Sequence, residues 1–181
     1  KEDGSYYLPH EFLHVAKHSK LYSKLSMSLI QKAFETFQIS SSGFSINLSY
    51  LDMTNIVTTT FIIEKLEEFN VGPWVIFEIL ESDGIENYDA VSKFIEKVKS
   101  YGAKIAIDDF GAGYSNFERL AELRVDFIKI DGSLIRNIDK NDEMKIIVRT
   151  IVSFAKELGI KTIAEYVHSQ SVVECVKEIG I

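Results

Sequence analysis

The chain has 181 residues, of which 46% are hydrophobic, and its formal net charge at pH 7 is −7. This length and apolar content predict one domain with a substantial core, and no apolar run reaches the ~18 residues of a membrane-spanning helix. The negative charge argues against binding to a nucleic-acid polymer, because polymer phosphates are held by clustered Lys and Arg.

The apolar pattern predicts two helices, followed by strands that alternate with helices. In chain order we expect helices at 10–17 and 22–37, a strand at 43–49, a helix at 56–69, strands at 73–81 and 103–110 flanking a helix at 88–101, a strand at 125–131, a helix at 143–158 and a strand at 161–167. Gly102 and Gly159 are expected to end helices, and residues 139–142 to cap one. The short strands, rich in Ile, Val and Phe, are expected to be buried on both faces.

Alternating strands and helices indicate a parallel sheet, either open and doubly wound or closed into a barrel. Each predicted strand has a polar or charged side chain near its carboxyl end: Asn47, Glu78, Asp108 with Asp109, Lys129, and Glu165. Active sites of (β/α)8 barrels are assembled from several strand ends, whereas an open sheet binds ligands at one switch point. The barrel is therefore favoured, although five strands and 181 residues fall short of the roughly 250 residues of such a barrel.

Four carboxylates at one edge would repel one another unless positive charge compensates them. Oxygen ligands of this kind suit Mg²⁺ or Mn²⁺, and two such ions can support in-line attack by water on a phosphodiester. Lys129 would then hold the attacking water or offset phosphate charge. The plainer alternative is structural ion pairing, for example between Asp109 and Lys129.

The stretch GAGYSN after the two aspartates is a weak match to a nucleotide-binding loop, because it lacks the third glycine of a dinucleotide fingerprint. Gly111 and Gly113 fit a mobile loop better. Glu81 could accept hydrogen bonds from that loop. His14 and His18 lie one helical turn apart, but no third zinc ligand is near in the sequence. All four histidines, including His10 and His168, are expected to be surface or packing residues.

Several motifs together resemble the EAL domain, a bacterial phosphodiesterase that opens cyclic di-GMP. They are FSINLS (44–49), IFEILES (76–82), IAIDDFGAGYS (105–115), DFIKIDGSLI (126–135) and TIAEYV (162–167). The resemblance covers nearly the whole chain and implies a TIM-barrel-like fold. It also implies that Asn47, Glu78, Asp108, Asp109 and Glu165 bind Mg²⁺ or Mn²⁺, that Lys129, Glu165 and Asp109 are catalytic, and that Glu81 supports the loop.

The chain also departs from the family pattern. The Glu-Ala-Leu strand that names the family, with its metal-binding Glu, is expected to precede Lys1, and a further motif to follow Ile181, so we expect a single EAL domain incomplete at both ends. Tyr166 and His168 replace a Gly and a Glu of the family pattern, and Asn116 replaces a Ser. These changes bear on substrate fit and metal geometry.

The expected function is therefore metal-dependent hydrolysis of cyclic di-GMP to linear pGpG. The resemblance also implies a homodimer, coupled to the site through the loop after Asp109, and fusion to sensory or GGDEF domains. The single cysteine, Cys175, excludes an internal disulfide, is expected to fill space in a helix and fits a cytoplasmic protein. Two alternatives stay open. One is a non-catalytic member of the same family that binds cyclic di-GMP or a protein partner, and the other is an enolase-like enzyme in which Lys129 abstracts a proton.

Overall fold

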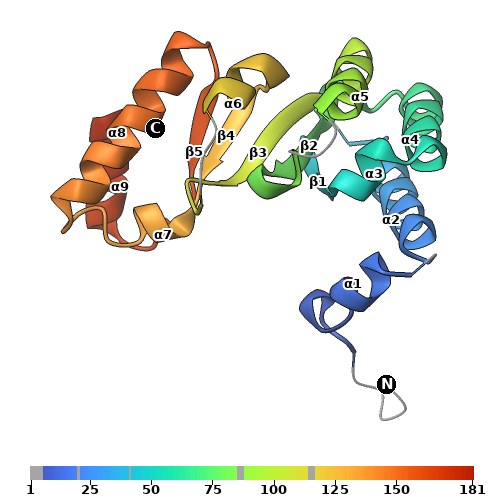
Figure 1. Ribbon diagram of the computed structural model, residues 1–181, viewed down its shortest axis with the longest axis horizontal. Coiled ribbons are helices and arrows are strands. Elements are labelled where there is room, and N and C mark those ends of the chain that lie inside the picture. Colours follow the sequence, from blue (N-terminus) through green and yellow to red (C-terminus); the bar gives the residue numbers. More distant parts are fainter. Residues whose placement is uncertain (1–5, 20, 41, 85–87, 114–116) are drawn as a thin grey trace.

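The computed structural model describes residues 6–19, 21–40, 42–84, 88–113 and 117–181, without the side chains of residues 10, 83, 84 and 119. Five parallel strands form one sheet in the order β1-β2-β3-β4-β5 (Figure 1). Their bounds are Phe44–Leu48, Val75–Leu80, Lys104–Phe110, Phe127–Ile130 and Lys161–Ala164. All five predicted strands are confirmed, each shortened by one to three residues at one or both ends.

The strand order distinguishes the two sheet types that the sequence left open. A doubly wound sheet reverses its strand order at a switch point, whereas each strand here pairs with the next strand in the chain. Sequential parallel order is the order of strands around a (β/α)8 barrel. The described strands thus form an arc of a TIM-barrel-like α/β fold.

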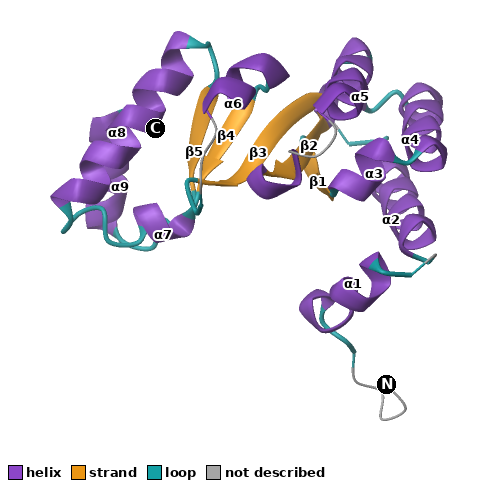
Figure 2. Ribbon diagram, in the orientation of Figure 1, coloured by secondary structure: helices purple, strands orange, loops and turns teal. Residues whose placement is uncertain are grey.

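Helices lie outside this arc, as the colouring by secondary structure shows (Figure 2). Their bounds are α1 Pro9–Lys17, α2 Tyr22–Phe37, α3 Tyr50–Thr54, α4 Ile56–Phe69, α5 Tyr88–Ser100, α6 Phe117–Leu123, α7 Gly132–Ile135, α8 Asp142–Glu157 and α9 Gln170–Ile179, with short 3-10 helices at Gly72–Trp74 and Glu81–Gly84. The five predicted helices are confirmed within one residue at each end. The short helices α3, α6 and α7 were not predicted, whereas the C-terminal helix expected around Cys175 is present as α9.

The predicted helix ends also agree with the structure. Asn141, within the predicted capping stretch, accepts hydrogen bonds from the backbone N–H groups of the first turn of α8. Gly102 and Gly159 follow α5 and α8 with φ angles of +88° and +70°. Side chains disfavour this left-handed region, so glycine is the residue suited to these two turns.

The two faces of the sheet differ in burial, and the expectation that both would be buried is wrong. On the helix-covered face, Phe77, Ile105 and Ile128 are fully buried. On the opposite face, residues of β2 such as Ile76 and Glu78 are only partly buried, and Asn47 on β1 is exposed. The cause is that five strands form an open arc, so the described residues place no further strands opposite this inner face.

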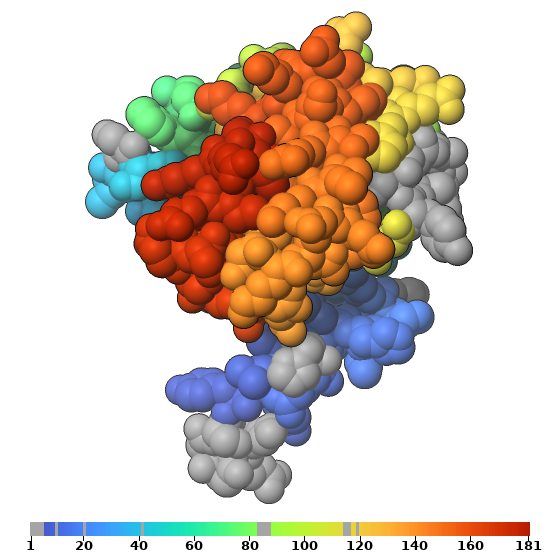
Figure 3. All heavy atoms as spheres, turned by 90° about the vertical axis from the view of Figure 1, so that its left-hand side faces the viewer, coloured from blue at the N-terminus to red at the C-terminus, as the bar shows by residue number. Residues whose placement is uncertain are grey.

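Helices α5 and α8 cover the outer face of the arc. The predicted apolar face of α5 is buried throughout, through Val91, Phe94, Ile95 and Val98. On α8, Val148 and Ile151 are buried, but Ile147 and Leu158, which we expected on the same apolar face, are each 42% exposed. Cys175 on α9 is buried, as expected of a small apolar filler, and α9 lies beside α8 (Figure 3).

Helix α1 projects from the body of the molecule (Figures 1 and 3). Between α1, α2 and the outer edge of β1 lies a groove of about 460 Å³, lined mainly by apolar side chains such as Leu13, Leu25 and Leu29. β1 is an edge strand, paired among the described residues only with β2. In the described part of the chain, no helix has the length and apolarity needed to cross a bilayer.

Candidate active site

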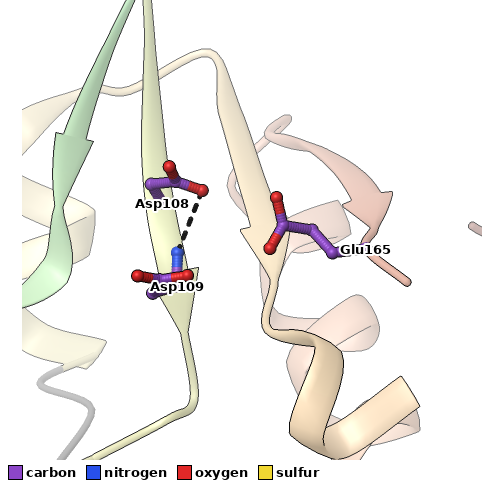
Figure 4. A group of neighbouring side chains, drawn as sticks. All are labelled: Asp108, Asp109 and Glu165. Carbon is purple, nitrogen blue, oxygen red and sulfur yellow. Dashed lines mark hydrogen bonds between the residues drawn. The ribbon is translucent and has the colours of Figure 1, made fainter. Parts of the chain in front are cut away.

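The two adjacent aspartates stand at a distortion in β3. Pairing between β3 and β4 shifts register between Ile107 and Phe110, and Asp109 has a φ angle of +53°. In a regular strand, neighbouring side chains point to opposite faces. The irregularity breaks this alternation and turns both carboxylates to the same end of the sheet (Figure 4), where Asp108 Oδ1 accepts a hydrogen bond from the Asp109 N–H at 3.1 Å.

Glu165 reaches this pair from two strands away. It directly follows β5, and its side chain faces the aspartates across the end of β4 (Figure 4). One carboxylate oxygen from each of Asp108, Asp109 and Glu165 lies within 4.8 Å of the other two. Three residues separated by up to 57 positions in the sequence thus form one acidic cluster, hereafter the acid cluster.

Lys129 supplies positive charge to the acid cluster from the inner face of β4. Its Nζ lies 2.7 Å from Asp108 Oδ1, 2.9 Å from Glu165 Oε1 and 3.2 Å from Glu78 Oε2. The expected pairing alternative, Asp109 with Lys129, is therefore not the one observed. The lysine instead links Asp108 and Glu165 of the acid cluster to Glu78 on β2.

The surroundings of Lys129 favour its charged form. Burial by itself lowers the pKa of Lys129, but hydrogen bonds to Asp108 and Glu165, and then to Glu78, outweigh burial and raise the pKa well above its usual value. A lysine that abstracts protons needs a lowered pKa. In this metal-free arrangement Lys129 is therefore held as a cation, which weighs against the enolase-like alternative.

The surroundings of Asp109 disfavour its negative charge. Desolvation is the largest cause of a raised pKa for Asp109, followed by the charges of Asp108, Asp131 and Glu165, while Lys129 opposes them. Asp109 is also the most exposed of the three carboxylates. A bound cation would therefore favour the ionised form of Asp109.

The sequence analysis did not single out Asp131. This residue follows β4 directly and caps α7, its Oδ1 accepting a hydrogen bond from the Ser133 N–H at 2.9 Å. Side-chain and backbone hydrogen bonds from Ser133 are among the causes that lower the pKa of Asp131 and keep it ionised. The rule that selected the other strand-end residues would have found Asp131, had it been extended two residues past Lys129 to the end of the predicted strand at 125–131.

The other predicted site residues, Glu78, Asn47 and Glu81, lie outside the acid cluster. Glu78 forms an ion pair with Lys129, which also contacts the acid cluster. Asn47 lies opposite Glu78 in the pairing of β1 with β2 and is exposed on the inner face. Glu81, in the 3-10 helix after β2, accepts a hydrogen bond at 3.0 Å from the N–H of Gly111. Gly111 begins the loop after Asp109, whereas Ser115 and Asn116 of that loop lie outside the described residues.

The histidines contribute no site among the described side chains. His14 and His18 are exposed, their ring centroids are 4.8 Å apart, and His18 Nδ1 lies 2.8 Å from the backbone oxygen of His14. His168 is exposed as well, next to Tyr166 and Arg136. The side chain of His10 lies outside the description.

The acid cluster fits a hard divalent cation. All of its donor atoms are carboxylate oxygens, the ligand type that Mg²⁺ and Mn²⁺ prefer, and neither Cys nor His is among them. Their mutual repulsion, which Lys129 offsets only in part, would be relieved by such an ion. The arrangement can thus hold a metal close to Glu78 and Lys129.

The whole chain, residues 1–181, matches the family described as "EAL domain". The chain belongs to the EAL domain family. The family resemblance drawn from the motifs is thereby confirmed, and the curated relatives carry matching descriptions. A probable cyclic di-GMP phosphodiesterase, PdeA of Escherichia coli, is 32% identical over all of this chain and 26% of its own length. The cyclic di-GMP phosphodiesterase PdeB of Shewanella oneidensis is 30% identical over 98% of this chain and 22% of its own length.

Solved EAL structures show the same fold. The PaMucR phosphodiesterase in complex with c-di-GMP superposes with a TM-score of 0.87 at 26% identity, covering 95% of this chain and 78% of that one. Klebsiella pneumoniae BlrP1, in a manganese and cyclic di-GMP complex, has a TM-score of 0.80 at 26% identity, covering 90% of this chain and 43% of that one. The chain spans about a quarter of the length of the curated relatives it matches.

Proposed function

We propose that this EAL domain hydrolyses cyclic di-GMP to linear pGpG with two bound Mg²⁺ or Mn²⁺ ions. The observation that carries the proposal is the convergence of Asp108, Asp109 and Glu165, whose carboxylate oxygens lie within 4.8 Å of one another, with Lys129 paired to Asp108 and Glu165. Relatives that are named cyclic di-GMP phosphodiesterases, and a relative solved with manganese and the cyclic dinucleotide, support the same reading.

We assign Asn47, Glu78 and Asp108 to one metal ion, and Asp108, Asp109 and Glu165 to the other. When bound, the ions would polarise the phosphodiester and lower the pKa of a coordinated water. The water oxygen bonds to phosphorus while the bond from phosphorus to the ribose 3′ oxygen breaks, which leaves a 5′ phosphate on the linear product. Lys129 orients the water, and Asp109 or Glu165 accepts its proton.

We propose that the described residues form only part of the EAL domain. The edge of β1 that pairs with no described strand, and the apolar groove beside it, suit one more strand, because such an edge offers free backbone groups and the groove can accept alternate side chains. The family resemblance places the Glu of the Glu-Ala-Leu motif on that strand. Glu81, through its bond to Gly111, supports the loop that follows Asp109.

Homodimerisation, fusion to sensory or GGDEF domains and a cytoplasmic location complete the proposal. The last of these fits the single, buried, unpaired Cys175. Sedimentation of the full-length protein would test the homodimer directly.

A receptor that binds cyclic di-GMP without cleaving it is the second candidate. It is favoured by Tyr166, which follows Glu165 in a left-handed backbone conformation and replaces the glycine of the family pattern. A shift of Glu165 caused by this residue would spare ligand binding and impair water activation.

The deciding experiment measures Mn²⁺-dependent conversion of cyclic di-GMP by chromatography, using the full-length protein that contains this chain. Asp108→Asn is the test variant. Asp126→Asn is the matched control, because Asp126 lies at the opposite end of the sheet, where it accepts hydrogen bonds from Lys99 and Ile105. Turnover that is lost only in Asp108→Asn supports the phosphodiesterase. Binding of cyclic di-GMP without turnover in the unmodified protein supports the receptor.

A further inference from the structure

Tyr166 has a backbone conformation that aromatic residues rarely adopt. Its φ angle is +55°, in the left-handed region, where a bulky side chain is an outlier. Its side chain sits against Gly132, since a Cβ added to that glycine would lie 2.9 Å from the Tyr166 Cβ. Strained residues of this kind persist only where surrounding contacts hold them, and they cluster at ligand-binding and active sites.

Two neighbours orient the ring of Tyr166 without burying it. Arg136 Cζ lies 4.4 Å from the ring centroid, and the His168 ring packs edge-on at 5.3 Å between centroids. His168 Nε2 in turn lies 2.8 Å from the backbone oxygen of Arg136. Tyr166 is nevertheless 56% exposed, so packing of the hydrophobic core does not account for the cluster.

The position of this cluster connects it to the acid cluster. Tyr166 is the residue after Glu165, and Gly132 and Arg136 lie at the start and just past the end of α7, the helix that follows β4. Tyr166 therefore stands at the carboxyl end of the sheet, one residue along the chain from Glu165 of the acid cluster. If a phosphate of cyclic di-GMP lies at the acid cluster, its guanine bases would contact residues around that cluster.

We propose that Tyr166, backed by Arg136 and His168, is a stacking platform for one guanine base of the bound cyclic dinucleotide. This inference rests on the proposed function. Stacking of a base on an aromatic side chain contributes about tenfold in affinity, and Arg136 adds positive charge beside an acidic site. The platform determines affinity for the substrate, and bond cleavage is left to the carboxylates and Lys129.

Kinetics of the full-length protein with cyclic di-GMP and Mn²⁺ test the platform. Tyr166→Ala is expected to raise KM about tenfold with a much smaller change in kcat, whereas Tyr166→Phe retains the aromatic face and should keep KM within about threefold. Binding measured with Ca²⁺ in place of Mn²⁺ should show the same order of affinities. Tyr166→Gly, which suits the positive φ angle, is the second variant should the alanine protein fold poorly.

Tyr101→Ala provides the matched control. Tyr101 also pairs with a cation, with Lys97 Nζ 5.4 Å from its ring centroid, but it follows α5 at the opposite end of the sheet. This variant should change the melting temperature and leave KM unaltered.

Three results would overturn the platform. The first is an unchanged KM in both Tyr166→Ala and Tyr166→Gly while the unmodified protein turns over normally, which leaves the phosphodiesterase intact. The second is an equal loss in Tyr166→Phe and Tyr166→Ala, which would assign the effect to the hydroxyl group. The third is an unmodified protein that neither binds nor cleaves cyclic di-GMP, which contradicts the proposed function and the platform together.

Discussion

Lys129 Nζ lies 2.7 Å from Asp108 Oδ1, so the acid cluster contains its own cation on the neighbouring strand. This contact makes the ionic site part of the fold as well as part of the proposed chemistry. Side chains of both residues are largely buried, at 16% and 15% exposure, so solvent screens their attraction less than that of surface pairs.

Replacing Lys129 with Met should therefore destabilise the metal-free protein by about 2 kcal/mol, because breaking a largely buried ion pair leaves carboxylate charges uncompensated. Denaturant unfolding in EDTA measures this loss. Added Mn²⁺ should raise the stability of Lys129→Met more than that of the unmodified protein, since the ion meets no competing ammonium.

The control for this variant is Lys99→Met. Lys99 Nζ lies 2.8 Å from Asp126 Oδ2, but the two side chains are 31% and 29% exposed and stand at the other end of the sheet. We expect a loss of at most about 1 kcal/mol. An Mn²⁺ response that is equal in the two variants would contradict the placement of the metal site at the acid cluster.

The loop after Asp109 offers a matched pair of glycines. Gly111 has a φ angle of +92°, and a Cβ there would come within 2.5 Å of a Leu134 methyl group, whereas Gly113 has nothing within 4 Å. Gly111→Ala should lower stability by about 1–3 kcal/mol and reduce turnover, and Gly113→Ala should leave stability within about 0.5 kcal/mol. Thermal unfolding of the two variants side by side checks the difference, and equal melting temperatures would be evidence against the strained turn.

The hydrogen bond between Glu81 and Gly111 predicts a separate effect on activity. Glu81→Gln keeps an oxygen that can accept from the Gly111 N–H, whereas Glu81→Ala leaves that donor unpaired. We expect Glu81→Ala to lower kcat at least about tenfold and to cost about 1 kcal/mol of stability. Glu81→Gln should retain most of the kcat, and an equal loss in both variants would indicate that the negative charge, rather than the hydrogen bond, is required.

Much of this fold follows from the sequence because strands and helices carry distinct apolar periods. The sequence also brings Asn47, Glu78 and Lys129 to one end of the sheet, since parallel strands align their carboxyl ends. Strand periodicity alone would place Asp108 and Asp109 on opposite faces, and only the family resemblance implied that both belong to one site, because their convergence depends on a register shift between β3 and β4. The sequence also does not predict that Arg136 packs on Tyr166, because this contact joins residues 30 positions apart and depends on where α7 places Arg136.

Titration of Asp109 gives a pH-dependent prediction for the metal-free protein. Its pKa is raised in the fold, so the protonated form stabilises the fold. That contribution is complete below the unfolded pKa of 3.8 and is lost as pH rises through the higher folded value. Asp109→Asn, neutral throughout, should exceed the unmodified protein in stability at pH 7 by less than about 1 kcal/mol, and the gap should close as pH falls toward the unfolded pKa.

Asp131→Asn should have the opposite effect on folding stability and be less stable than the unmodified protein at pH 7. The pKa of Asp131 is lowered, so its ionised form contributes stability that is present above the unfolded pKa and lost as pH falls through the folded value. Asparagine still caps α7, which confines the change to charge. Melting temperatures of both variants in EDTA between pH 4 and pH 7 check the pair, and the same pH trend in both would refute the assigned causes.

The most direct measurement of the central claim is Mn²⁺ binding by electron paramagnetic resonance in the full-length protein with cyclic di-GMP present, followed by product analysis of the same samples. We expect two Mn²⁺ ions per chain and linear pGpG, with both ion binding and product reduced in Asp108→Asn and unaffected in Asp126→Asn. Cyclic di-GMP that stays intact in the unmodified protein, or Mn²⁺ binding that is indifferent to Asp108→Asn, would contradict that claim.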